Sequence, residues 1–307
     1  MDLDVLFLGT AASAPTANRG LPATLVRRGG ERLLFDCGEG TQRQIMQSVA
    51  SGEVDDIFIT HRHADHVLGL PGLLKTYSLH DRERRLRLWG PPGLRKLWET
   101  MGAVVGRLSF DVQLEEMAAG EELPGDGYTI TAFNVDHPGA FGYALAEHER
   151  PGRFDEARAR ELGVRPGPDF GRLQAGEAVG EVTPDQVVGP ARPGRTIVLG
   201  GDSAPCDMTT AMARGADLLV HEATFMAADA ARARNTRHST AQGAARLAAE
   251  AGVKLLALTH ISARYFVRDI VAEAQAEFGP VIVPRDFDRV ELPFAESGEP
   301  AHVRATD

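Results

Sequence analysis

The amino-acid sequence predicts an α/β protein in which two β-rich halves form a sandwich with helices on the outside. Short apolar strands recur in both halves, segments with helical spacing accompany them, and a stretch rich in proline and glycine separates the halves. With 307 residues, 43% of them hydrophobic, the chain can bury a sizeable core. A chain of this length could form one large domain or two small ones.

The first half is expected to consist mainly of strands, because its apolar runs are short and bounded by turn residues. Gly29-Gly30 marks a hairpin between two of them. Helical spacing runs from Gly40 to Val49 and again over Gly93–Met101. The expected strands are Leu3–Leu8, Ala23–Val26, Arg32–Phe35, Asp56–Thr60, Arg85–Trp89, Thr129–Val135 and Phe141–Ala146.

The segment from His148 to Pro193 interrupts this pattern. It is rich in proline and glycine, and only Phe154–Leu162 has helical spacing, so it is poorly suited to a core. Two interpretations remain open from composition alone: an ordered arm that protrudes from the body, or a solvated linker between two halves.

The second half alternates strands and longer helices, which favours helices packed on the outside of a sheet. The expected strands are Thr196–Gly200, Leu218–His221 and Lys254–Thr259, and the expected helices are Ser239–Ala251 and Tyr265–Glu277.

Charge and cysteine content narrow the possible partners and compartments. The formal net charge is −10, whereas a general binder of polyanions normally has a basic balance. The acidic start, Met1 to Asp4, lacks the basic region of a signal peptide, and no apolar run approaches the roughly 18 residues that span a bilayer. The only cysteines, Cys37 and Cys206, suit a reducing compartment. We expect a cytoplasmic protein with no membrane or DNA partner.

A dense group of metal-ligand side chains follows the strand Asp56–Thr60. His61, His63, Asp65 and His66 lie within six residues of one another, at a loop where side chains can converge from different directions. Imidazole nitrogen and carboxylate oxygen are suitable ligands for divalent metals such as zinc. A lone histidine is more often structural, but three histidines and an aspartate in this spacing favour metal binding.

Three further candidate ligands each follow a predicted strand. They are His137, Asp202 and His260. Residues that follow the strands at one edge of a sheet cluster in space, so these side chains can meet the loop that carries His61 to His66. Each one alone could instead cap a turn or bond a backbone amide. Together they would complete two metal sites.

Two metals about 3.5–4 Å apart can share a hydroxide nucleophile and a bridging carboxylate, an arrangement used for displacement at phosphorus. Hydrolysis is therefore the expected reaction class. Asp202 is the natural bridging carboxylate. Asp65 could ligate the second metal, or orient and deprotonate the attacking water, or do both.

Other sequence blocks lie along nearly the whole chain: Phe7-Leu8-Gly9-Thr10, Phe35-Asp36-Cys37-Gly38-Glu39-Gly40-Thr41-Gln42-Arg43-Gln44, Thr60–His66, Gly201-Asp202-Ser203, His221-Glu222-Ala223-Thr224, His238-Ser239-Thr240, and Thr259-His260 with Ser262 to Tyr265. In these blocks and their order the sequence resembles the bacterial short form of tRNase Z, the tRNA 3′-processing endoribonucleases. The H-x-H-x-D-H block alone indicates only the metallo-β-lactamase superfamily, which also includes thioester hydrolases.

The resemblance implies a single metallo-β-lactamase-like domain over residues 1–307. This fold is a four-layer αββα sandwich, here with an inserted flexible arm over residues 149–190. It implies two zinc ions, with manganese or iron as substitutes, and a homodimer. In the family's pattern, one zinc is held by His61, His63 and His137. The other is held by Asp65, His66 and His260, and Asp202 bridges the two.

The resemblance also implies roles for residues that chemistry alone leaves open. Glu222 and His238 would serve proton transfer to the departing 3′ oxygen, whereas His238 by itself would be interpreted as a residue at a helix start. The arm would grip the tRNA elbow from a neighbouring subunit by phosphate contacts and overall RNA shape. The arm residues expected to bind substrate are Arg153, Arg158, Arg165, Gly167 and Pro168.

The leading hypothesis is an endonuclease that cuts precursor tRNA 3′ of the discriminator nucleotide, leaving a 3′-hydroxyl on the tRNA and a 5′-phosphate on the trailer. A second hypothesis keeps the metal site but assigns a small phosphodiester or another hydrolase substrate, such as a thioester. A third is a catalytically inactive RNA-binding or scaffolding protein.

Overall fold

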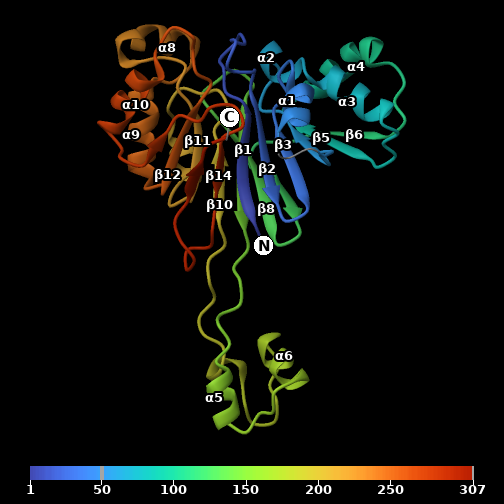
Figure 1. The fold of residues 1–307 in the computed structure, drawn as a ribbon, viewed down its shortest axis with the longest axis vertical. Helices are drawn as coiled ribbons and strands as arrows, with labels where there is room; N and C mark the ends of the chain where they lie inside the picture. The colour runs from blue at the N-terminus through green and yellow to red at the C-terminus, as the bar shows by residue number, and fades with distance from the viewer. Residues whose placement is uncertain (49–51, 306–307) are drawn as a thin grey trace.

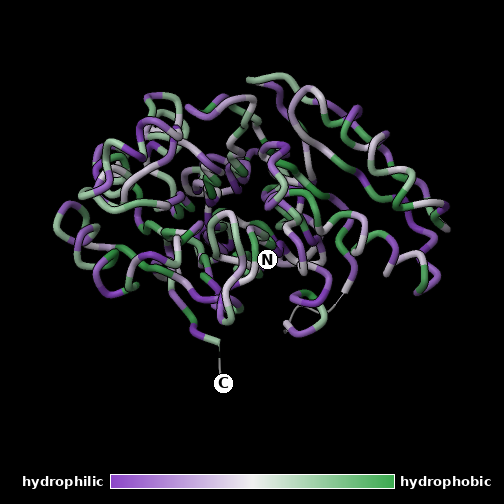
Figure 2. Tube along the Cα trace, turned by 90° about the horizontal axis from the view of Figure 1, so that it is seen from above, coloured by the Kyte–Doolittle hydropathy of each residue, from purple (hydrophilic) through white to green (hydrophobic). Residues whose placement is uncertain are grey.

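Two β-sheets lie face to face in the body of the protein, and helices cover the outer face of each sheet (Figure 1). Seen from above, helices lie at the two sides of the body with the strands between them (Figure 2). This computed structural model describes residues 1–48 and 52–305. The four-layer αββα arrangement predicted from the sequence is confirmed.

The first sheet is antiparallel on one side and parallel on the other. Its strand order is β15-β14-β1-β2-β3-β4-β5-β6, and β3 to β6 run parallel. The bounds are β1 Leu3–Gly9, β2 Ala23–Arg28, β3 Glu31–Phe35, β4 Asp56–Phe58, β5 Leu86–Gly90, β6 Val112–Glu116, β14 Arg289–Glu291 and β15 Ala301–Val303. The helices on this side are α1 Thr41–Gln47, α2 Ala64–Val67, α3 Leu70–Leu79 and α4 Leu94–Val105.

The second sheet has the order β13-β12-β11-β10-β9-β8-β7, with β10 to β13 parallel. Its strands are β7 Glu122–Gly125, β8 Tyr128–Asn134, β9 Phe141–Glu147, β10 Thr196–Leu199, β11 Leu218–Glu222, β12 Leu255–Thr259 and β13 Val281–Ile282. Its helices are α7 Asp207–Met212, α8 Ala230–Thr236, α9 Ala241–Ala251 and α10 Val267–Gln275.

The core between the sheets is rich in aromatic side chains. Phe35 and Phe58 stack with ring centroids 4.9 Å apart, and Tyr143 packs edge-on against Phe58. The buried Tyr143 hydroxyl donates a hydrogen bond of 2.8 Å to the Ile59 carbonyl. Each large buried side chain contributes about 1.5–3 kcal/mol to folding. This core therefore fixes β4, which leads into the histidine-rich loop, against the opposite sheet.

The expected strands and helices are present with bounds shifted by a few residues. Of the helical segment predicted over Gly40–Val49, the last residue, Val49, lies outside the described residues. Elements that were not expected have weak sequence patterns. β6 carries polar residues on both faces, β7 is only four residues long and contains Pro124, and α3 contains Pro71 and Gly72, which normally break helices. The proline lies in the first turn of α3, where its missing N–H costs nothing.

The segment between β9 and β10 forms a long arm that projects from the body (Figure 1). Because β9 and β10 are neighbours in one sheet, the segment is an insertion and not a linker between halves. The expectation that it is poorly suited to a core was wrong. The arm contains α5 Glu156–Glu161 and α6 Pro168–Gln174, which enclose a small apolar cluster of Ala159, Val164, Phe170, Leu173, Val182 and Val187. Gly167 and Pro168 begin α6 and do not break it.

No helix within residues 1–48 and 52–305 combines the length and the apolar character needed to cross a bilayer.

A buried ion-pair network secures the end of the sandwich from which the arm leaves. The Glu147 carboxylate accepts hydrogen bonds from Arg28 at 2.9 Å and from Arg195 at 2.7 and 2.8 Å. The side chains of all three residues are less than one-tenth exposed. Burial alone would raise the pKa of Glu147, but the hydrogen bonds from Arg195 and Arg28 outweigh it and lower this pKa.

We expect Glu147→Gln to lower the free energy of unfolding by about 3–5 kcal/mol at pH 7, because it leaves the buried Arg195 guanidinium without its anion and Arg28 with only the more exposed Glu31 at 3.3 Å. The pKa of Glu147 is lower in the folded than in the unfolded protein. Its negative charge therefore stabilises the fold fully above the unfolded pKa of about 4.3, and this stabilisation is lost as the pH falls through the folded-state pKa. Urea unfolding should therefore show a difference in the free energy of unfolding between the wild type and Glu147→Gln, and this difference should decrease as the pH is lowered. A constant gap would contradict this assignment.

Candidate metal centre

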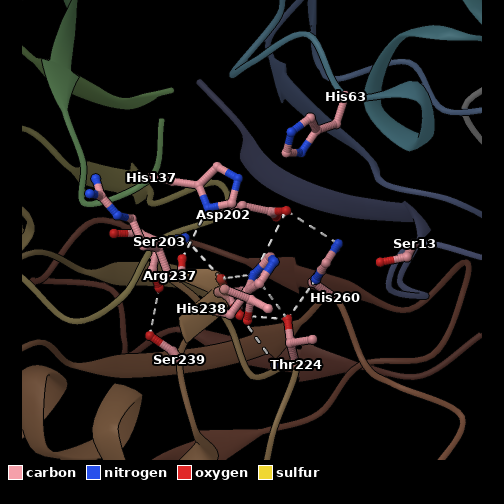
Figure 3. Close-up of polar contacts among 12 residues, drawn as sticks. Ser13, His63, His137, Asp202, Ser203, Thr224, Arg237, His238, Ser239 and His260 are labelled. Atoms are coloured by element: carbon pink, nitrogen blue, oxygen red, sulfur yellow. Dashed lines mark hydrogen bonds and ion pairs between the residues drawn. The ribbon is translucent and has the colours of Figure 1, made fainter. Parts of the chain in front are cut away.

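The candidate ligands meet because the strands before them end at the same edge of the two sheets. β4 leads to His61, β10 to Asp202 and β12 to His260. β8 is antiparallel to β9, which is antiparallel to β10, so β8 and β10 point the same way and His137 reaches the same edge. The side chains converge between the two sheets, where His137 and His260 lie on either side of Asp202 (Figure 3).

The first group of side chains consists of His61, His63, His137 and Asp202. One ligand atom from each lies within 4.8 Å of the others. His61 Nε2 is 2.8 Å from His63 Nδ1 and 3.8 Å from Asp202 Oδ2. His63 is exposed and the other three are buried, so the group is closed on the protein side and accessible through His63.

The second group consists of Asp65, His66 and His260, again with ligand atoms within 4.8 Å of one another. Asp65 Oδ2 is 3.5 Å from His66 Nε2 and 3.4 Å from His260 Nε2. Asp202 Oδ2 is 3.4 Å from each of the same two nitrogens. One oxygen of Asp202 therefore lies between the two groups, as a bridging carboxylate would.

The outer nitrogens of these histidines are held by contacts that the sequence analysis did not anticipate. Asp36 Oδ2 lies 2.7 Å from His66 Nδ1, and Asp36 also accepts hydrogen bonds from the Thr60 amide and hydroxyl. Thr224 Oγ1 contacts His260 Nδ1 at 2.7 Å. His137 Nδ1 lies 3.0 Å from the Arg237 carbonyl. Such contacts orient the opposite ring nitrogen toward a metal.

The donor set fits divalent metal ions. Within the described residues, the buried Nε2 atoms of His66 and His137 have no hydrogen-bond partner, although both face the cluster. Burial, with a smaller contribution from neighbouring His66, lowers the pKa of His61 to about 2, which keeps its imidazole neutral. Burial would raise the pKa of Asp65, but His260 and His66 lower it to about 2, so its carboxylate is ionised. Neutral imidazoles and ionised carboxylates are the forms that bind metal.

A histidine and a glutamate that contact each other, His238 and Glu222, lie beside the cluster. His238 Nδ1 is 2.6 Å from Glu222 Oε1 and 4.0 Å from Asp202 Oδ2. Glu222 is buried at the end of β11 and accepts hydrogen bonds from the Ser203 amide and from Thr224. Burial would lower the pKa of His238, but the hydrogen bond and charge of Glu222 outweigh it and raise this pKa. Glu222 thus positions the imidazole and favours its protonated form.

A hollow of about 410 Å³ is lined by His238 and by Thr224, which contacts the candidate ligand His260. One wall is the loop of residues 12–16, whose Ser13 amide donates a 3.1 Å hydrogen bond to Asp65. Arg232 and Arg264 line the same hollow. The arrangement combines a His/Asp cluster whose donor atoms fit divalent metal ions, an imidazole paired with Glu222 and a basic rim, which suits hydrolysis of an anionic ester.

The arm residues expected to bind substrate do not reach this cluster. Arg153, Arg158, Arg165, Gly167 and Pro168 are all exposed on the arm, which projects away from the body. Arg158 forms an exposed pair with Glu161 at 3.1 Å. Any role they have in binding is therefore remote from the cluster.

We expect Asp36→Asn to weaken zinc binding by about 10- to 100-fold, because the amide cannot hold both His66 and Thr60 as the carboxylate does. Competition with a chromophoric chelator would measure the affinity. Asp4→Asn is the matched control, since Asp4 on β1 pairs with Arg27 on β2 and is not among the candidate ligands or their contacts. Equal zinc affinity in the two variants would contradict the role of Asp36.

Similar proteins were found by sequence over nearly the full chain. Ribonuclease Z from Gemmatimonas aurantiaca is 48% identical, covering 96% of this chain and 98% of that protein. Ribonuclease Z from Haloferax volcanii is 46% identical, covering 97% of each. A family model described as Anti-Pycsar protein Apyc1 matches residues 3–124, which is less than half of the chain.

Solved structures show the same architecture. Human tRNase Z, short form, is 30% identical with a TM-score of 0.69, covering 95% of this chain and all of that one. YhfI from Bacillus subtilis, a metallo-β-lactamase fold protein, has a TM-score of 0.71 over 95% of this chain at 19% identity, which supports the fold alone. The body has the metallo-β-lactamase fold.

Proposed function

We propose that this chain, which belongs to the ribonuclease Z family, is a metal-dependent endoribonuclease that removes the 3′ trailer from precursor tRNA. The proposed cut is 3′ of the discriminator nucleotide. The observation that carries this function is the pairing of Glu222 and His238 beside two ligand groups that share Asp202. That arrangement supplies what hydrolysis of a phosphodiester with an alkoxide leaving group requires.

The ligand groups support two divalent metal ions in each subunit, and we propose zinc, with manganese or iron as substitutes. His61, His63 and His137 would hold one ion, Asp65, His66 and His260 the other, and Asp202 both. When bound, such ions supply Lewis acidity and make water nucleophilic near neutral pH.

The remaining chemistry falls to side chains of the chain itself. Asp65, tethered by the Ser13 amide, would orient the attacking water and accept its proton. His238, held by Glu222, would give a proton to the departing 3′ oxygen of the tRNA. Glu222 is the positioning residue of this pair, because its other oxygen is fixed by Thr224.

The arm is the proposed binding site for the body of the tRNA. Arg153, Arg165 and the Gly167-Pro168 tip are exposed, so they are free to contact phosphates. Recognition of RNA shape at a remote site is compatible with the acidic balance of the chain. We further propose a homodimer, in which the arm of one subunit serves the other, acting in the cytoplasm.

Incubation of zinc-loaded protein with a precursor tRNA that carries a 3′ trailer tests this function. Primer-extension or sequencing of the products should show one cut, immediately 3′ of the discriminator nucleotide. A control RNA with the same acceptor stem and trailer but without the T-arm should be cut slowly. Equal cleavage of both RNAs, or scattered cuts in the tRNA, would argue against this substrate.

We expect His238→Ala to lower kcat for precursor tRNA by about 10²–10⁴-fold, the usual contribution of a positioned general acid. The effect should shrink to about tenfold or less for bis(p-nitrophenyl) phosphate, whose nitrophenolate leaves without a proton. Steady-state kinetics on both substrates give the comparison. If the two substrates lost equal activity, His238 would have a role other than proton donation.

A further inference from the structure

The loop between β14 and β15, residues 292–300, reaches the point where the arm joins the body. We call this loop the root hairpin. Two of its side chains, Phe294 and Glu296, contact Arg150 and Arg192, which face each other across the base of the arm. Neither side chain is part of the metal centre, which lies at the opposite end of the strands.

Phe294 is held between two guanidinium groups. The Cζ atoms of Arg150 and Arg195 lie 3.3 Å and 3.9 Å from the ring centroid. Two groups this close to one centroid cannot share a face of the ring, so they stack on opposite faces. Arg195 is buried and fixed by Glu147, by the Leu292 carbonyl at 2.8 Å and by the Met1 carbonyl. Phe294 therefore links the arm to a rigid part of the body.

Glu296 joins the two backbone segments that connect the arm to the body, which we call the stalk. Its oxygens accept two hydrogen bonds of 3.0 Å from Arg150 and one of 2.8 Å from Arg192. The backbones of these two arginines pair across the stalk with bonds of 2.8 Å, so their like charges face each other. The hydrogen bonds from Arg150, with the backbone at Glu296, lower the pKa of its carboxyl to about 2. An anion is thus held where two cations would otherwise repel.

Beyond this point the stalk is thin. Its two backbone segments are joined by a few hydrogen bonds. Gly189 N donates to the Arg153 carbonyl, and Asp155 N donates to the Val187 carbonyl. An isolated two-stranded ribbon is only marginally stable, so it cannot by itself fix the direction of the arm. A small rotation at the root moves the distant end of the arm a long way, as the length of the projection makes plain (Figure 1).

We propose that Phe294 and Glu296 are positioning residues that set the direction of the arm and thereby the affinity for a large RNA substrate. This inference rests on the proposed function. It assigns substrate selection partly to a hairpin that contacts neither the metal centre nor the exposed arm tip. Hydrolysis of a small phosphodiester should not depend on the root hairpin.

Steady-state kinetics of Glu296→Gln and Phe294→Leu test the proposal. We expect KM for precursor tRNA to rise about tenfold with kcat nearly unchanged, and turnover of bis(p-nitrophenyl) phosphate to stay at the wild-type level. Loss of an acidic charge by itself would strengthen RNA binding, so a rise in KM cannot come from simple electrostatics. Glu299→Gln is the matched control: Glu299 lies on the same hairpin, is exposed, and has no ion pair among the described residues. Glu296→Asp should recover part of the affinity.

Hydrogen exchange provides a readout that does not depend on the substrate. The amides of Arg150, Gly189 and Arg192 should exchange faster in Glu296→Gln than in Glu299→Gln, while amides of β9 and β10 stay protected. A KM or an exchange rate equal to that of the control would overturn the proposal. If the wild-type protein did not cleave precursor tRNA, the proposed function would fail, but the exchange result would still report on the hairpin.

Discussion

His66→Ala is expected to abolish hydrolysis of both precursor tRNA and a small phosphodiester. His66 Nε2 lies 3.4–3.5 Å from Asp202 and Asp65, and its removal takes one of the three side chains from the second ligand group, leaving His260 as the only imidazole near these two carboxylate oxygens in that group. We expect a loss of about 1,000-fold or more in kcat, the rate equivalent of roughly 4 kcal/mol of transition-state stabilisation. Metal content measured on the same preparation should fall toward one ion per subunit.

His80→Ala is a matched control, because His80 is an exposed histidine at the end of α3, outside the cluster. Its activity and metal content should equal those of the wild type. A His66→Ala protein that processed precursor tRNA at the full rate would show that the cluster is not the reaction centre.

Deletion of the arm is the second change with a large expected effect. Replacing residues 149–190 with two glycines should lower kcat/KM for precursor tRNA by on the order of 100-fold, as expected if the arm provides roughly 3 kcal/mol of binding. Turnover of bis(p-nitrophenyl) phosphate should remain, since the arm has its own small core and does not contribute ligands to the cluster. The deletion thus separates RNA binding from the chemistry.

The deletion is feasible because the ends to be joined are close: Glu147 N donates to the Arg195 carbonyl at the base of the arm. Thermal unfolding should show that the body remains folded. Loss of both activities in a folded protein would mean that the arm supports the metal centre, and retention of both would remove its role in tRNA binding.

The sequence was sufficient for the parts of the site whose signal is local. His61 to His66 have ligand spacing within one loop, and His137, Asp202 and His260 each follow an apolar strand, so their convergence could be anticipated from topology. Asp36 also follows a strand, β3, and the same rule could have found it. Its role was missed because an aspartate at the end of one strand, without a neighbouring histidine in sequence, is common in turns.

Other features depend on contacts between segments distant in sequence. The position of Asp202 Oδ2 between the two ligand groups and the contact of Thr224 with His260 exist only once β10, β11 and β12 are paired. The core of the arm was missed because its apolar residues are spread among prolines and glycines that begin helices and turns. Phe294 contacts Arg150 and Arg195, which precede it by 144 and 99 positions, and no periodicity in the sequence can indicate such contacts.

The central claim is that water, and not the ribose 2′-hydroxyl, attacks the phosphorus at this metal centre. Cleavage of a precursor tRNA in ¹⁸O-labelled water, followed by mass spectrometry of both products, tests it most directly. We predict one ¹⁸O atom in the 5′-phosphate of the trailer and an unlabelled 3′-hydroxyl on the tRNA. A 2′,3′-cyclic phosphate on the tRNA with an unlabelled 5′-hydroxyl on the trailer would contradict it.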